Sequence, residues 1–150
     1  MSGIEFSVHG MPVAQGSKKV IKGHLIEMAD ARLRTWRQDV ASVAADEMKQ
    51  NSLGPFAGPV AVRLAFSLPR PRNHFGTGRN AEILKGSAPS YPAVHPDLDK
   101  LARSVLDALT GYCFYDDKQV VALDLAKWYG PPGMEAQVME VQASAAQSVQ

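Results

Sequence analysis

The sequence lacks most of the features that mark secreted, disulfide-stabilised or membrane proteins. Its single cysteine, Cys113, excludes an internal disulfide and a cysteine-rich zinc site. No apolar run is long enough to span a membrane, and the N-terminus has no basic region followed by an apolar segment. We therefore expect a cytoplasmic protein with no membrane partner.

The sequence also has little net charge, because the whole chain carries only +1. Its distribution is uneven, however. Residues 1–96 contain 12 Lys and Arg against 7 Asp and Glu, a balance of +5, whereas residues 97–150 contain 4 against 8, a balance of −4. This pattern fits a protein that binds a polyanion with one surface and a metal with another, although chance produces uneven charge as well.

The length of 150 residues suits one domain with a real core, and we expect a single domain over 1–150. Alternating apolar residues predict strands at 4–9, 60–68, 119–128 and 134–142. The last two are expected to pair as a hairpin across Gly130–Gly133, and a shorter hairpin is possible within 20–28.

Helical periodicity appears in two segments. The first begins after Asp30, as an N-cap, and runs to about residue 50; the second covers about 98–110 and stops at Gly111. The fold class is therefore α+β, with a mixed sheet of about four or five strands and two main helices packed on it. The tail at 143–150 is expected to be frayed.

Two basic segments are candidates for contact with phosphates. Residues 15–19 form a small loop with Lys18 and Lys19, which is either a phosphate site or an exposed turn. Residues 69–96 form a long loop rich in proline, glycine and basic residues, with Glu82 as its only acidic residue. This loop either closes over a nucleic-acid backbone or is a plain insertion.

Four aspartates are the candidate metal-binding residues. Asp97 and Asp99 stand at the start of the second helix, and Asp116 and Asp117 stand just before the strand at 119–128. If the strand runs antiparallel to the helix, the chain returns to the point where the helix began. We therefore expect the two acidic pairs to lie close together. Clustered carboxylates repel one another unless a cation lies between them. Mg²⁺ would activate water and neutralise charge on a phosphodiester, but a helix cap and a turn explain the same residues.

The segment 96–121 resembles the RusA family of Holliday junction resolvases. It reads Pro-Asp-Leu-Asp-Lys-Leu at 96–101, Asp-Ala-Leu at 107–109 and Tyr-Asp-Asp-Lys-Gln-Val-Val at 115–121. The family pattern is roughly Asp-Leu-Asp-Asn-Leu, then Asp-Ala-Leu, then an aromatic residue, Asp-Asp, any residue and Gln-Val-Val. The likeness is weaker before residue 96, although residues 8–18 are similar to phage-type members.

The resemblance implies a Mg²⁺-dependent homodimer, with Mn²⁺ as a possible substitute, that nicks four-way DNA junctions symmetrically in a bacterial or phage-infected host cell. Asp97, Asp99 and Asp117 fall on the family's catalytic, metal-binding aspartates. Arg103 takes the place of a catalytically important lysine; arginine can hold phosphate but is a poor proton donor. The basic residues expected to contact DNA are Lys18, Lys19, Arg70, Arg72, Arg79, Lys100 and Lys127.

Two other functions fit the same residues. The first is a non-catalytic protein that binds branched or single-stranded DNA and whose acidic cluster is structural. The second is a nuclease for other branched DNA.

Overall fold

The computed structural model describes residues 2–16, 18–21, 24–27 and 31–142, and for 18–21 and 24–27 it describes the backbone alone. The predicted N-cap Asp30 and the predicted frayed tail at 143–150 lie outside the described residues.

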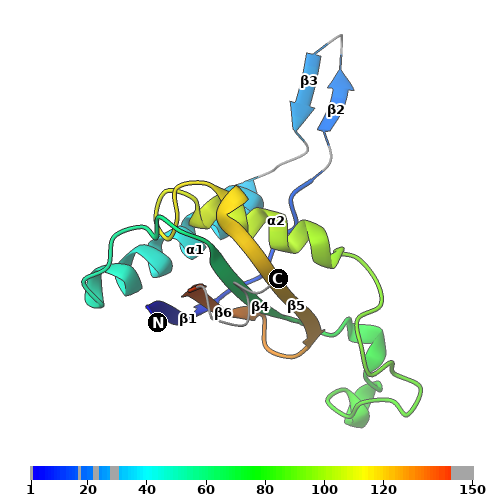
Figure 1. The fold of residues 1–150 in the computed structure, drawn as a ribbon. Helices are drawn as coiled ribbons and strands as arrows, with labels where there is room; N and C mark the ends of the chain where they lie inside the picture. Colours follow the sequence, from blue (N-terminus) through cyan, green and yellow to red (C-terminus); the bar gives the residue numbers. More distant parts are fainter. Residues whose placement is uncertain (1, 17, 22–23, 28–30, 143–150) are drawn as a thin grey trace, which may run out of the picture.

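A four-stranded mixed sheet forms the centre of the fold (Figure 1). Its strands are β1 (Gly3–His9), β4 (Val60–Leu68), β5 (Val120–Tyr129) and β6 (Gly133–Glu140), in the spatial order β1-β6-β4-β5. β4 and β5 run parallel, and the other neighbouring strands run antiparallel. A separate hairpin of β2 (Lys18–Ile21) and β3 (His24–Glu27) projects from this body. The predicted α+β class is confirmed.

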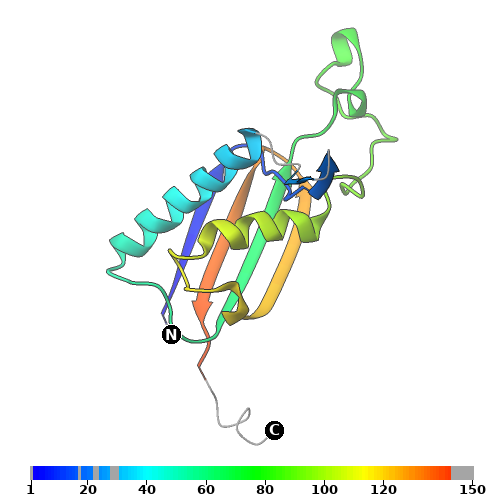
Figure 2. The ribbon, with the colours of Figure 1, turned by 90° about the horizontal axis from the view of Figure 1, so that it is seen from above.

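Two helices, α1 (Ala31–Gln50) and α2 (Leu98–Leu109), lie on the same face of the sheet (Figure 2). α1 packs against β1 and α2, and α2 reaches β5. Three short 3-10 turns complete the described chain: η1 (Arg72–His74), η2 (Gly78–Asn80) and η3 (Asp117–Gln119). Within the described residues, no helix combines the length and the apolar character that crossing a membrane requires.

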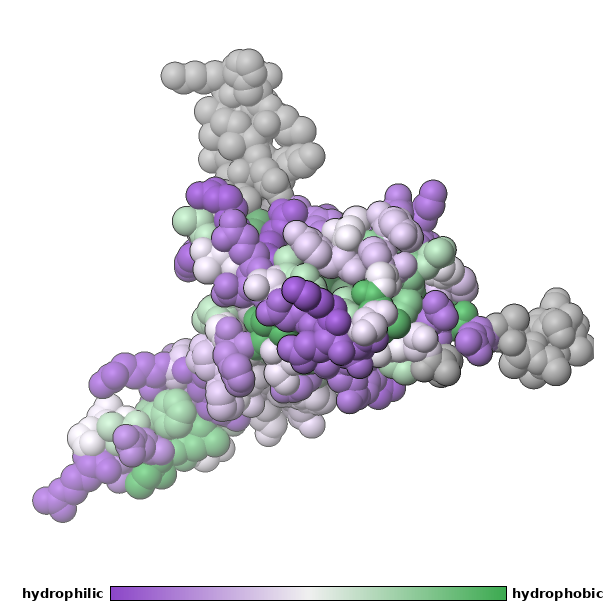
Figure 3. Space-filling model, turned by 90° about the vertical axis from the view of Figure 1, so that its left-hand side faces the viewer, coloured by the Kyte–Doolittle hydropathy of each residue, from purple (hydrophilic) through white to green (hydrophobic). Residues whose placement is uncertain are grey.

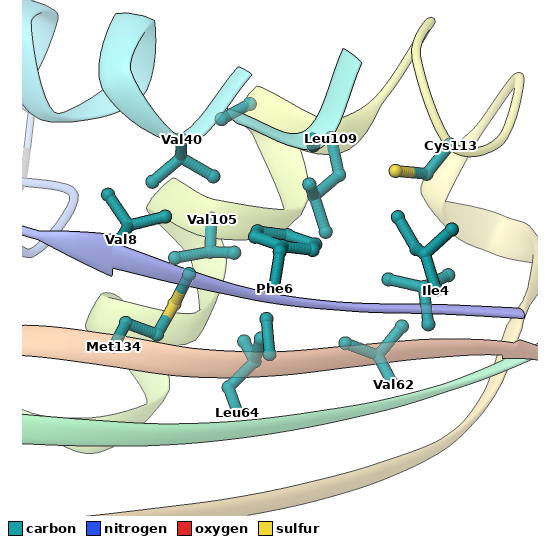
Figure 4. Close-up of a cluster of buried hydrophobic side chains, with 14 of the residues drawn as sticks. Ile4, Phe6, Val8, Val40, Val62, Leu64, Val105, Leu109, Cys113 and Met134 are labelled. Atoms are coloured by element: carbon teal, nitrogen blue, oxygen red, sulfur yellow. The ribbon is translucent and has the colours of Figure 1, made fainter. Parts of the chain in front are cut away.

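The core lies between the helices and the sheet (Figure 4). Alternate residues of β4 are buried from Val60 to Leu68, as the period of two predicts. Val40 of α1 and Val105 and Leu109 of α2 meet these side chains, and none of the three is exposed. Each such side chain contributes about 1.5–3 kcal/mol by leaving water, so this layer fixes both helices on the sheet.

The predicted hairpin between the last two strands is wrong, because β6 lies between β1 and β4 and does not touch β5. The short link passes over the end of β4, where the Gly130 amide donates to the Leu68 carbonyl at 2.9 Å. A Cβ on Gly130 would lie 2.6 Å from the Ser67 hydroxyl oxygen, so a glycine fits here. Burial explains the order: β6 buries Met134, Ala136 and Val138, as a central strand should, whereas β5 is largely exposed and takes the edge.

Candidate active site

Asp97 and Asp99 lie at the amino end of α2, as the sequence predicts. Asp97 is the N-cap residue, but its side chain makes no capping hydrogen bond. Its carboxylate oxygens instead lie 3.1 Å from His95 Nδ1 and 3.5 Å from Lys100 Nζ, and the Asp97 side chain is 43% exposed. Asp99, in the first turn of the helix, is exposed. The positive end of the helix favours negative charge here, and neither carboxylate is used up by capping.

Lys127, near the end of β5, holds the segment that leads into Asp97. Its ammonium donates hydrogen bonds to the carbonyl oxygens of Val94 at 2.7 Å and Pro96 at 2.8 Å. The peptide bond between His95 and Pro96 is cis. The sequence suggested that Lys127 contacts DNA; in the folded chain its ammonium group bonds to protein carbonyls.

Asp116 and Asp117 lie in the turn that opens β5. The Asp116 carboxylate accepts a hydrogen bond from the Lys118 amide at 2.9 Å, so Asp116 acts as a cap. Asp117 follows it and is exposed. The turn interpretation therefore holds for Asp116 and leaves the Asp117 carboxylate at the surface.

Gln119 fixes this turn, and sequence reasoning missed its role. Its side-chain amide donates to the carbonyls of Phe56 at 2.7 Å and Gly58 at 2.8 Å. Its side-chain oxygen accepts from the amides of Tyr115 at 2.8 Å and Asp116 at 3.0 Å. Gln119 thus ties the acidic turn to the chain entering β4. The spacing Asp-x-x-Gln at 116–119 is the capping-box signal that could have identified it.

The two acidic pairs do not meet within one chain, so the expectation that they converge is wrong for a single chain. Lys127 contacts Pro96, which places the far end of β5 beside Asp97. Asp117 precedes the opposite end of β5, where the Gln119 side chain donates a hydrogen bond to the Gly58 carbonyl. About eight residues of strand, roughly 26 Å, separate these two ends. Among the described residues, no three His, Cys, Asp or Glu side chains gather closely enough to hold a metal ion.

This geometry fits Mg²⁺ in part. The ion is often held by one or two carboxylates together with waters and substrate phosphates, each oxygen about 2 Å from the metal. Asp97 and Asp99, two residues apart at one helix end, supply two carboxylates of the kind that Mg²⁺ uses. Asp117 of the same chain does not, because a shared ion needs its ligand oxygens within about 4 Å of one another.

The basic residues fall into different environments. Arg70 packs 4.3 Å from the centre of the Tyr129 ring and donates to the Pro89 carbonyl at 2.7 Å, so it braces its own loop. Arg72 and Arg79 lie exposed on the same loop, which projects at the lower left of Figure 3 with hydrophilic and hydrophobic patches. Lys18 and Lys19 begin β2, and their side chains lie outside the described part.

Two basic residues of α2 lie near the first acidic pair. Lys100 is beside the Asp97 carboxylate. Arg103 is exposed and stands four residues after Asp99, which places both on one stripe of the helix. Asp107, the next member of that stripe, is half-buried. Arg103 is therefore free to reach a phosphate that approaches the amino end of α2.

Comparison with known proteins identifies the chain's relatives. Residues 9–139 match the family model described as Endodeoxyribonuclease RusA. The chain is also similar to the uncharacterized protein YqaN of Bacillus subtilis (strain 168), with 32% identity over 146 residues that cover 95% of this chain and 100% of the relative. Because the family match spans most of the chain, this protein belongs to the RusA endodeoxyribonuclease family.

Proposed function

We propose that this protein is a Mg²⁺-dependent endonuclease that resolves four-way DNA junctions by paired, symmetric nicks, acting as a homodimer in the cytoplasm of a bacterial or phage-infected cell. The observation that supports the proposal most directly is the position of Asp97 and Asp99. Both lie on the positive end of α2, and both follow directly on the basic loop at 69–96. The family match adds DNA cleavage as the chemistry.

Each residue has a distinct part in the proposed reaction. Asp97 and Asp99 would hold the cation, whereas Asp117 of the same chain lies too far from them to share it. Mg²⁺, or Mn²⁺ as a substitute, supplies a Lewis acid that offsets the charge of the reacting phosphate. Arg103 holds a phosphate oxygen through a group that stays protonated. Arg72 and Arg79 contact the DNA phosphate backbone outside the site, and Lys18, Lys19 and Lys100 make further contacts. Junction binding should therefore weaken steeply as the salt concentration rises.

A labelled synthetic four-way junction tests the proposal. The purified protein should give two symmetric nicks in Mg²⁺ and none in EDTA, while a matched linear duplex stays intact. Asp99→Asn should bind the junction and leave it uncut. Metal-dependent nicking by this variant at the wild-type rate would contradict the role of the acidic pair.

The same assay separates the alternatives. Junction binding without a metal-dependent product would favour a non-catalytic protein for branched or single-stranded DNA. Faster cleavage of flaps or three-way junctions than of four-way junctions would favour a nuclease for other branched DNA.

A further inference from the structure

A cleft beside the amino end of α2 has no part in the reaction proposed above. We infer that this cleft binds an unstacked nucleobase of the DNA, from a nucleotide next to the phosphate that Asp97 and Asp99 would serve. The inference rests on the proposed function for the identity of the ligand as DNA. It adds a site for a base to the sites proposed for metal and phosphate.

The cleft has three walls. The segment 10–14 after β1 forms one wall and the first turns of α1 form the second, while His95 and Pro96 close the side toward the acidic pair. Its volume is about 690 Å³, within the range of roughly 300–1,000 Å³ that ligand sites occupy. The apolar side chains in the walls are Met11, Pro12, Val13, Trp36 and Pro96. A largely apolar ligand that carries a few polar groups therefore suits the cleft.

The wall at 10–14 is anchored to α2. The buried Ser104 hydroxyl donates a hydrogen bond to the Val13 carbonyl at 2.7 Å. The Gln15 amide, just after the wall, donates to the Lys100 carbonyl at 3.0 Å. These bonds hold the segment in place without a ligand, so binding loses little affinity to ordering of the protein.

The indole of Trp36 supplies a hydrogen-bond donor to the cleft. Trp36 lines the cleft and is only 2% exposed. Among the described residues, its buried Nε1 has no hydrogen-bond partner. Buried polar groups are nearly always paired, because an unpaired donor loses its bonds to water without a replacement. An acceptor on a ligand in the cleft supplies the missing bond.

The polar groups at the rim favour a base over a phosphate. Arg32 and Asp39 are exposed and bring one charge of each sign, so the rim is not the cationic surface that phosphate contacts need. An unpaired base offers both acceptors and N–H donors on its Watson–Crick edge. Asp39 stands three residues after Trp36, on the same side of α1, and its carboxylate accepts hydrogen bonds. One base can therefore accept from Trp36 Nε1 and donate to Asp39.

The position of the cleft connects it to cleavage. His95 lines the cleft, and its Nδ1 lies 3.1 Å from the Asp97 carboxylate. Pro96 also lines the cleft and directly precedes Asp97. A nucleotide next to a phosphate at the acidic pair is therefore beside the cleft. Unstacking a base costs least where stacking is already interrupted, as at the crossover of a four-way junction.

The fluorescent base 2-aminopurine, whose emission rises when it leaves the stack, tests the inference without cleavage. It is placed in turn at each nucleotide around the crossover of a synthetic four-way junction, and the full-length protein is added in EDTA. Emission should rise at a nucleotide next to a nicked phosphate, while a gel shift of the same sample shows that the junction is bound. A bound junction with no rise at any position would overturn the inference. A junction that does not bind would overturn it together with the proposed function.

Two substitutions connect the signal to the cleft. Met11 is 54% exposed, so Met11→Trp should fold normally and fill the cleft. It should abolish the rise in emission and weaken junction binding at least about 5-fold. Trp36→Phe, which removes the indole N–H, should weaken binding by about 3–10-fold. Ser42→Trp adds an indole to an exposed position of α1 outside the cleft and is the matched control. Equal emission and affinity for Met11→Trp and Ser42→Trp would contradict the base site, whether or not Trp36→Phe folds.

An abasic nucleotide at the responding position separates a base site from a general defect in DNA binding. The wild type and Met11→Trp should bind the abasic junction equally, because it has no base for the cleft to hold. A loss of affinity that persists on the abasic junction would show that Met11→Trp acts elsewhere, and the inference would fail.

Nicking of the same junction in Mg²⁺ distinguishes failure of the base site from failure of the proposed function. If emission and affinity depend on the cleft but no junction is cut, the proposed function fails and the base site stands. If the wild type nicks the junction while the cleft variants bind and fluoresce as it does, the base site fails and the proposed function stands.

Discussion

Lys127 Nζ donates a hydrogen bond of 2.8 Å to the carbonyl oxygen of Pro96, and this contact joins the edge strand to the residue before Asp97. A second bond, to Val94, strengthens the same connection. The sequence predicts that Lys127 binds DNA, but this contact gives it a positioning role. It also fixes which end of β5 belongs to the acidic site, and the interpretation of Asp117 depends on that assignment.

We predict that Lys127→Met lowers cleavage at least about 10-fold and destabilises the fold by about 1–3 kcal/mol, because two carbonyls lose a charged donor. The dependence of junction affinity on salt should keep its slope, since no phosphate contact is removed. A slope reduced by about 0.9 would instead indicate that Lys127 neutralises a phosphate. Lys127→Arg is the control that keeps the charge.

Asp97→Asn should separate charge from helix capping. Asn caps as well as Asp does, and the Asp97 side chain makes no capping bond to lose, so the free energy of unfolding should change by less than about 0.5 kcal/mol. Cleavage should fall at least about 100-fold while junction binding persists, as measured by gel shift and nicking on the same sample. A large loss of thermal stability would show that the residue is structural.

Gln119→Leu should destabilise the protein by about 2–4 kcal/mol, because it removes four hydrogen bonds and leaves the carbonyls of Phe56 and Gly58 unpaired. The urea midpoint should fall with an unchanged denaturant slope. The neighbouring Lys118 is exposed, so Lys118→Ala is the matched control and should leave the midpoint in place. Equal midpoints for the two variants would remove Gln119 from its positioning role.

Much of the fold follows from local patterns, and the failures share one physical cause. The alternation in β4 and the stripe of α2 specify which faces are buried, and Gly111, at φ +92°, ends the helix as predicted. The partner of β6 was missed because a short turn and two alternating strands favour a hairpin locally. β6 takes the central position between β1 and β4 because Met134 and its neighbours become buried there, and this tertiary effect outweighs the local preference for a hairpin with β5.

The separation of the two acidic pairs was missed for the same reason. Asp97 and Asp99 need only the helix start, which local sequence specifies. The distance to Asp117 depends on which end of β5 meets α2, and the long-range bonds of Lys127 and Gln119 determine that. The periodicity of apolar residues along the sequence does not reveal these long-range bonds.

Arg79 and Arg70 should respond differently to truncation, although both belong to the basic loop. Arg79→Ala should leave stability unchanged and reduce the salt slope of junction binding by about 0.9, because an exposed arginine can neutralise one phosphate. Arg70→Ala should keep the slope and cost about 1–2 kcal/mol, because it removes the contact with the Tyr129 ring and the bond to Pro89. Identical slopes for both variants would contradict this division.

Arg103 should act through its charge rather than by proton transfer. Arg103→Ala should lower cleavage by about 10–100-fold without changing the unfolding free energy, since the side chain is exposed. Arg103→Lys, which restores the residue type of the family, should recover most of the rate. Lys49→Ala, which removes an exposed charge from the end of α1, controls for net charge. Rates are compared under single-turnover conditions, where an Arg103→Lys variant as slow as Arg103→Ala would show that the planar guanidinium, not the charge alone, is required.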